Sequence, residues 1–167
     1  MKKHDFDFEK ILELNKHKIY RICNIYAVNP IEPQDLFQEV IFQIWKSLES
    51  FKGNASIDTW VYRITLNVCM RSKMKLDKQN AQIDRFNSIH IKSTSSEFNE
   101  EEKTRLNYLR ECISILDEKD KSLVILYLED LPYKEISTIT GLSENHIAVK
   151  MKRIKAKLFE CITAKIK

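Results

Sequence analysis

Apolar residues recur at intervals of three and four along the first half of the chain, which is the spacing of one helix face. The pattern predicts a helix from 8 to 26 that ends before Pro30, and a second that begins near Pro33. Gly53 and Asn54 interrupt the pattern, and Ser56 can cap a third helix. The predicted buried stripes are Leu36, Val40, Ile44 and Leu48 in the second helix and Ile57, Val61, Ile64 and Val68 in the third.

The same spacing returns after Leu106 and predicts four more helices. The last two are separated by a tight turn at Gly141, and Ser143 can cap the final helix. The predicted buried stripes of these helices are Leu106, Leu109, Ile113 and Leu116 in the first, Leu123, Val124 and Tyr127 in a helix over 120–128, and Ile147, Met151, Ile154 and Leu158 in the final helix. The arrangement is typical of a helix-turn-helix, and the alternative is an αα-hairpin within a bundle.

A polar and acidic stretch separates the two sets of helices. Residues 84–102 hold five acidic side chains against Arg85 and Lys92 and show no sustained apolar period. These features are typical of a linker. We therefore predict an all-α protein with two small helical domains, 1–75 and 106–167, joined by a flexible linker over 76–105.

Composition supports an all-helical fold and removes several other classes. The 167 residues include only 2 Gly and 3 Pro, too few turn residues for a sandwich, a barrel or a glycine-rich phosphate loop. No apolar run is long enough to span a membrane, and the start of the chain does not resemble a signal peptide. These features predict a cytoplasmic protein without membrane insertion.

The cysteines and histidines are scattered, with no CxxC pair among them. We expect Cys23, Cys69, Cys112 and Cys161 to be buried free thiols, because a reducing cytoplasm disfavours disulfides. The spacing also argues against a zinc site, and His146 is expected to contact DNA or solvent. No metal and no cofactor is predicted.

Positive charge is concentrated in two segments, although the formal net charge is only +4. One segment runs from 60 to 80 and the other from 143 to 167. A single basic run is often a solvated helix face, but two on amphipathic helices favour nucleic acid. In the first segment, Trp60, Arg63, Asn67 and Arg71 form a stripe that could stack on bases and hold phosphates.

The second predicted helix carries more apolar surface than one buried face requires. Phe37, Ile41 and Trp45 form a second stripe, with Phe42 between the two. Either the helix is buried on two sides within its own domain, or Gln38, Phe42 and Trp45 border a docking surface for a partner.

Two blocks of the sequence carry motifs that match a known family. Residues 35–45, the Phe51-Lys52-Gly53 segment and residues 59–67 resemble region 2 of the extracytoplasmic-function (ECF) sigma factors, which belong to the sigma-70 family. Residues 116–158, with Tyr133-Lys134-Glu135-Ile136 and Gly141-Leu142-Ser143-Glu144, resemble region 4. The two blocks follow the family's order and cover nearly the whole chain apart from the linker.

The resemblance implies a bacterial transcription initiation factor without catalytic residues. Region 2 would dock on the clamp helices of core RNA polymerase and melt the −10 element, while region 4 would read the −35 element and dock on the β flap. Most members have an anti-sigma factor, which could hold the protein at the inner membrane face. The implied sites are Asp35, Gln38, Glu39, Phe42 and Trp45 for polymerase; Phe51, Lys52, Asn54, Ser56, Trp60, Arg63, Asn67 and Arg71 for the −10 element; and Ser143, Glu144, Asn145, His146, Lys150, Arg153 and Lys157 for the −35 element.

Two departures from the family pattern and two rival functions remain. Ile57-Asp58 puts an acid where a basic residue is usual, and Asn145-His146 replaces a pair of small residues. The rivals are a dimeric helix-turn-helix regulator, in which Phe37, Phe42 and Trp45 would form the dimer interface, and a nucleic-acid enzyme. The enzyme would need a nucleophile or a carboxylate cluster on a rigid element, and the sequence pattern indicates neither.

Overall fold

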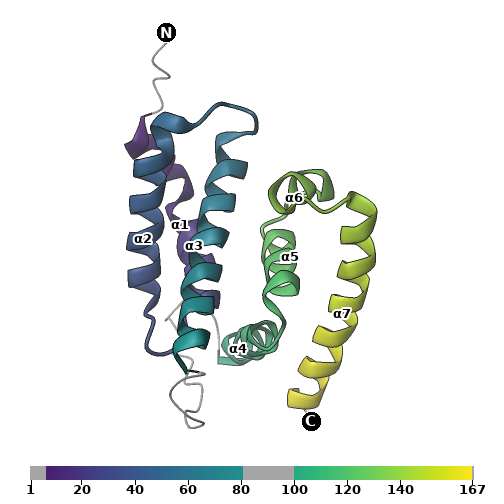
Figure 1. Cartoon of the computed structure of the whole chain (residues 1–167). Helices are drawn as coiled ribbons and strands as arrows, with labels where there is room; N and C mark the ends of the chain where they lie inside the picture. The colour runs from purple at the N-terminus through teal and green to yellow at the C-terminus, as the bar shows by residue number, and fades with distance from the viewer. Residues whose placement is uncertain (1–6, 81–99, 167) are drawn as a thin grey trace. The chain divides into compact units, whose positions relative to one another are not determined.

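The computed structural model describes residues 7–80 and 100–166, and every regular element in these ranges is helical (Figure 1). The all-α prediction is thereby confirmed. The chain divides into two compact units, Met1–Ser88 and Ile89–Lys167. The helices are α1 (Phe8–Tyr26), α2 (Pro33–Ser47), a short 3-10 turn η1 (Leu48–Ser50), α3 (Ile57–Asn80), α4 (Glu100–Ser114), α5 (Glu118–Leu128), α6 (Tyr133–Thr140) and α7 (Glu144–Ile166).

In the first unit, α1, α2 and α3 pack against one another in a three-helix bundle (Figure 1). Each helix begins where a local signal allows it to. The Asp7 side chain accepts a hydrogen bond from the Glu9 backbone, Pro33 occupies the first turn of α2, and Ser56 Oγ accepts from the Thr59 backbone N–H. The core consists mainly of aliphatic side chains at the predicted spacing, among them Ile19, Ile22, Leu36, Val40, Ile44, Val61 and Val68.

In the second unit, α7 packs against α4, α5 and α6. The Asp117 side chain caps α5 by accepting from the Asp120 backbone N–H at 2.9 Å. Gly141 ends α6 with a φ of 77°, a left-handed conformation that glycine adopts without a Cβ penalty. Ser143 Oγ accepts from the His146 backbone N–H at 3.3 Å and caps α7. Ile136 of α6 and Ile147, Met151 and Ile154 of α7 are fully buried, and α6 packs on α7, so the predicted helix-turn-helix is present.

The helices reach further into the predicted linker than its polar composition suggested. Helix α3 continues to Asn80 and α4 begins at Glu100, so both ends of the 76–105 segment are helical. Leu76 explains part of this difference, because it is buried and extends the apolar face of α3 by two turns beyond Val68. The serine-rich centre of the linker, 93–96, lies outside the described residues.

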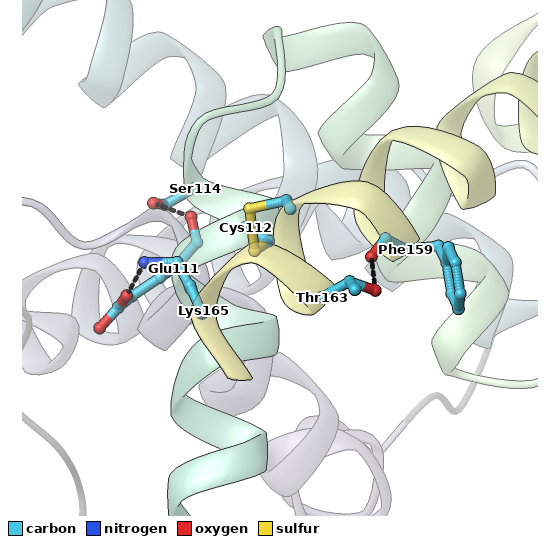
Figure 2. Close-up of a disulfide and its surroundings, with 7 residues drawn as sticks. Glu111, Cys112, Ser114, Phe159, Thr163 and Lys165 are labelled. Carbon is cyan, nitrogen blue, oxygen red and sulfur yellow. Dashed lines mark hydrogen bonds and ion pairs between the residues drawn. A yellow bond between two sulfur atoms is a disulfide. The ribbon is translucent and has the colours of Figure 1, made fainter. Parts of the chain in front are cut away.

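The expectation of four free thiols is wrong for two of the cysteines. Cys112 on α4 and Cys161 on α7 form a disulfide, with their Cα atoms 5.9 Å apart (Figure 2). The pair was missed because its members are 49 residues apart in the sequence, and only the packing of α4 on α7 brings them together. Cys23 and Cys69 are free and buried, as predicted.

Candidate nucleic-acid interface

The exposed face of α2 carries all five residues predicted to contact polymerase. Asp35, Gln38 and Glu39 are exposed, and the side chains of Phe42 and Trp45 are 48% and 60% exposed. The two aromatic rings lie side by side, with centroids 6.2 Å apart. The opposite face holds the buried stripe that packs on α1 and α3. Of the second predicted stripe, Phe37 and Ile41 are partly buried, with the Phe37 ring 5.7 Å from that of Tyr20 on α1. Phe42 and Trp45 remain exposed and form an apolar surface beside acidic groups.

The loop between η1 and α3 holds the first residues predicted to contact the −10 element. Lys52 and Asn54 are exposed, and Gly53 turns the chain with a φ of 70°. Phe51 is partly buried and packs on the ring of Trp60, at 5.1 Å between centroids. Ser56 is engaged in capping α3, with its Oγ also donating to Thr59 Oγ1. The loop therefore sits against the first turn of α3 through an aromatic contact and a cap.

The stripe predicted on α3 faces outward. Arg63, Asn67 and Arg71 are exposed, whereas Trp60 is partly buried against Phe51. Arg71 Nε donates to the backbone carbonyl of Asn67 at 3.2 Å. A shallow pocket continues beyond Arg71 and is lined by Met74, Lys75 and Lys78, so the basic face extends to the last turns of α3. Guanidinium and ammonium groups along one helix face can neutralise successive phosphates.

The acid that departs from the family pattern has a structural partner. Asn15 on α1 is buried, and its Nδ2 donates to Asp58 Oδ1 at 3.1 Å and to the Ile11 carbonyl at 3.0 Å. Asp58 thus provides an acceptor for the buried amide N–H groups of Asn15 across the α1–α3 contact. Its carboxylate joins two helices at a position where the sequence alone suggested an acid beside DNA.

The first turn of α7 presents the polar residues predicted to read bases. Glu144, Asn145 and His146 are exposed, as are Arg153 and Lys157 two and three turns further along. The side chain of Ser143 is a cap, so its hydroxyl already accepts a hydrogen bond within the protein. In a helix-turn-helix, the N-terminal end of the second helix enters the major groove, where side chains meet base edges.

Lys150 is held within the protein by a contact that the sequence did not predict. Its Nζ lies 2.5 Å from Oδ1 of Asp120 on α5, whose side chain is only 9% exposed. Lys157 Nζ lies 3.7 Å from the other carboxylate oxygen. A shallow pocket lined by His146, Val149 and Arg153 as well as these three residues surrounds the cluster. Asp120 therefore lies beneath the basic face of α7 and neutralises part of it.

A third lysine of α7 also contacts α5. Lys155 Nζ donates to Tyr127 Oη at 2.8 Å and lies 4.1 Å from the centre of that ring. The hydrogen bond to Tyr127 raises the pKa of Lys155, which stays charged at neutral pH. Sequence reasoning missed both Asp120 and Tyr127, because each meets its lysine across about 30 residues of chain. Lys152 and Arg153, by contrast, are exposed on α7.

Within the two described ranges, no three His, Cys, Asp or Glu side chains are grouped so as to hold a metal ion. In those same ranges, no helix combines the length and apolar character needed to cross a membrane.

Family models match both units of the chain. The model for sigma-70 region 2 matches residues 11–79, and the model for sigma-70 region 4 matches residues 106–158. The first match includes the exposed face of α2, the η1–α3 loop and almost all of α3. The second includes α5, α6 and the part of α7 that carries the predicted base-reading residues.

Individual proteins give the same result. The chain is 26% identical over 164 residues to the ECF RNA polymerase sigma factor SigW of Bacillus subtilis, covering 92% of this chain and 88% of that protein. It is 25% identical over 140 residues to the sigma factor SigV of the same species, covering 83% and 81%. The sigma factor RpoE of Bartonella quintana, solved with the anti-sigma factor NepR, shares the fold with a TM-score of 0.76 at 18% identity, covering 94% of this chain and 97% of that one. The chain therefore belongs to the sigma-70 family and is an ECF sigma factor with regions 2 and 4.

Proposed function

We propose that this chain binds core RNA polymerase and directs initiation at specific promoters. In this proposal residues 1–75 dock on polymerase and melt the −10 element, residues 76–105 span the distance between promoter elements, and residues 106–167 read the −35 element. One observation carries the proposal: each unit presents an exposed face within a segment that matches a sigma region. In the first unit this face is the aromatic pair on α2, within the region 2 match, and in the second it is the basic face of α7, within the region 4 match.

The α2 face has the composition of a protein interface. Phe42 and Trp45 form an exposed aromatic centre, while Asp35, Gln38 and Glu39 supply a polar rim. Acidic rim groups favour a basic partner surface and speed the encounter. Aromatic side chains that become buried at the centre of an interface contribute most of its binding energy. We assign this face to the clamp helices of polymerase.

The η1–α3 loop and the exposed face of α3 could together bind an opened −10 element. Extruding a base costs a few kcal/mol, which the protein must return through contacts to that base. Stacking on an aromatic ring supplies about 1–3 kcal/mol per base, and Phe51 and Trp60 form an aromatic pair beside exposed Lys52 and Asn54. Arg63, Asn67 and Arg71 continue along α3 and would hold the strand's phosphates.

The −35 element would be read by the first turn of α7. Asn145 and His146 can form hydrogen bonds with base edges, and Arg153 lies further along for phosphate contact. Lys150 and Lys157 contribute less free charge than a count of lysines suggests, because Asp120 pairs with both. Specificity would therefore depend on the exposed first turn more than on general positive charge.

Polymerase would supply all of the chemistry, and the chain would act where polymerase and promoter DNA meet, in the cytoplasm. RpoE of Bartonella quintana was solved with an anti-sigma factor, and we propose that a partner of that class binds this chain as well. The second unit would also contact the polymerase β flap.

The test is association with core polymerase. The full chain and purified core polymerase are mixed at micromolar concentration and separated by size exclusion. The proposal expects a stoichiometric complex and a monomeric free chain. A dimer that elutes apart from polymerase but binds DNA would instead support a stand-alone helix-turn-helix regulator.

A further inference from the structure

The chain contains two pairs of neighbouring cysteines in different chemical states. Cys112 and Cys161 in the second unit are joined by a disulfide. Cys23 and Cys69 in the first unit are free thiols and fully buried. The side-chain hydrogen bond to Cys23 and burial raise the pKa of Cys69 well above its ordinary value, so the Cys69 thiol stays protonated and unreactive.

The disulfide joins the first and last helices of the second unit. On α4 the buried residues are Cys112 and Ile113, and on α7 they are Ile147, Met151 and Ile154, all on the N-terminal side of the disulfide. The last turns of α7 therefore contribute no fully buried apolar side chain of their own. Beside the disulfide, Lys165 Nζ pairs with Glu111 at 2.5 Å, as Figure 2 shows. At this end of α7, the attachment to α4 therefore combines one covalent bond with contacts from α7 side chains that are not fully buried.

One sulfur atom of the disulfide belongs to a residue that solvent can reach. Cys112 is buried, whereas Cys161 is partly exposed. A surface pocket lined by both cysteines, Leu116, Asp117, Lys157 and Glu160 opens beside them. Thiol–disulfide exchange requires an attacking thiolate to reach one sulfur while the other leaves. The geometry offers Cys161 for attack and leaves the Cys112 sulfur as the leaving group.

We propose that Cys112 and Cys161 form a redox modification site through which a protein dithiol and a two-electron oxidant change the state of the −35-reading unit. The inference rests on the proposed function, because that function places the chain in a compartment where thiols are normally kept reduced. Disulfides found in such compartments are usually transient and redox-sensing.

Atoms and electrons balance in both the reduction and the re-formation of the disulfide. In reduction, a thiolate of the dithiol attacks Cys161 Sγ and releases the Cys112 thiolate, which takes up a proton. The second thiol of the reductant then attacks the mixed disulfide, which leaves two protein thiols and an oxidised reductant. In oxidation, hydrogen peroxide converts the Cys161 thiol to a sulfenic acid with release of water. The Cys112 thiol displaces a second water and restores the disulfide.

The two states differ in how firmly α4 is held. With the disulfide closed, α4 is fixed to α7, and the 49-residue separation makes this a long-range cross-link. With it open, α4 and the last turns of α7 loosen, whereas the helix-turn-helix keeps its own buried contacts through Ile136, Ile147 and Met151. The reduced protein should thus retain its base preference but unfold at lower temperature and bind promoter DNA more weakly near that temperature.

The experiment uses the full chain in glutathione buffers of graded reduced-to-oxidised ratio. Thiols are trapped with iodoacetamide and counted by mass spectrometry. We expect Cys112 and Cys161 to become alkylated together at ratios typical of the cytoplasm, while Cys23 and Cys69 stay unmodified until the protein is denatured. We also expect reduction to lower the thermal midpoint of the second unit by at least about 10 °C and leave that of the first unit unchanged.

Two variants separate a redox site from a merely structural bond. The double variant Cys112→Ala/Cys161→Ala should match the reduced protein in both oxidising and reducing buffer. The matched variant Cys23→Ala removes a thiol elsewhere and should keep the full redox response. A disulfide that stays closed at every cytoplasmic ratio, or a reduced protein with unchanged thermal midpoint, would overturn the proposal. Neither readout involves polymerase, so failure here is distinguishable from failure of the proposed sigma function.

Discussion

At the scale of single residues, Asp120 neutralises part of the positive charge of α7, the helix proposed to bind the −35 element. Its carboxylate is nearly buried and pairs with Lys150, and more distantly with Lys157. A carboxylate in this position can act in two ways: it ties α5 to α7, and it prevents two ammonium groups from binding phosphates indiscriminately. Both effects favour a helix whose exposed first turn determines which sequence is bound.

Asp120→Asn should therefore increase general DNA binding at the expense of discrimination. Because the Lys150 ammonium is no longer neutralised, the slope of log K against log salt should steepen by about one unit. Loss of the pair should lower the free energy of unfolding by about 1–3 kcal/mol. Fluorescence anisotropy with promoter and scrambled duplexes at several salt concentrations measures the first effect. If adding Lys150→Met does not restore the original slope, the freed charge is not that of Lys150.

Asn145 and Lys152 should affect binding differently. An asparagine can pair with adenine, and a correct pair provides about 1–3 kcal/mol of discrimination. Asn145→Ala should thus relax preference at one or two −35 positions and leave the salt slope nearly unchanged. Lys152→Ala should weaken binding to all sequences alike and lower the slope by about one unit. A competition titration of a randomised −35 library at two salt concentrations compares them, and an identical profile for both variants would contradict these roles.

At the scale of helices, α2 carries its fully buried and its exposed apolar side chains on different faces. Val40 and Ile44 hold the bundle, while Phe42 and Trp45 are exposed. Trp45→Glu should weaken polymerase binding by at least about 2 kcal/mol, or roughly 30-fold, without unfolding the protein. Leu14→Glu is the matched control, since Leu14 is an exposed apolar residue on α1 outside the predicted surface. Titration against labelled core polymerase, with circular dichroism of each variant, measures both. Unfolding of Trp45→Glu would mean that the side chain belongs to the core.

Because the Asp117 side chain caps α5, the stability of the second unit should depend on pH. The hydrogen bond from the Asp120 backbone N–H holds the pKa of Asp117 below its ordinary value. Its stabilising contribution is therefore complete above the unfolded pKa, near 3.9, and is lost as the pH falls through the lower folded value. Below about pH 4 the wild type should lose stability more steeply than Asp117→Asn, which still caps but does not titrate. Urea unfolding between pH 2.5 and 6 measures this difference, and parallel curves would contradict it.

Elements that depend on neighbouring residues were predictable from the sequence, and contacts between distant residues were not. The start and end of α1, the caps at Ser56 and Ser143 and the turn at Gly141 follow from signals a few residues long. Asp120 with Lys150, and Cys112 with Cys161, are separated by 30 and 49 residues, and no local pattern marks them. Charge runs likewise predicted a basic face on α7 but not the carboxylate beneath it.

At the scale of the whole molecule, the proposed function has the two units perform two different tasks, with the polymerase supplying all of the chemistry. The exposed α2 and α3 faces belong to the first unit, and the exposed first turn of α7 belongs to the second. Their cooperation requires a chain that reaches from one promoter element to the other. Elements about 25 base pairs apart are separated by roughly 85 Å along B-form DNA. Because α3 continues to Asn80 and α4 begins at Glu100, the segment 81–99 could span at most roughly 65 Å, and the widths of the two units would have to supply the rest.

The most direct test of the central claim is transcription in vitro. Core polymerase with and without the full chain is given a library of promoter fragments, and the 5′ ends of the transcripts are sequenced. The account predicts new start sites that depend on the chain and share both a −10 and a −35 element. Start sites identical to those of core polymerase alone would contradict the claim that this chain directs promoter-specific initiation.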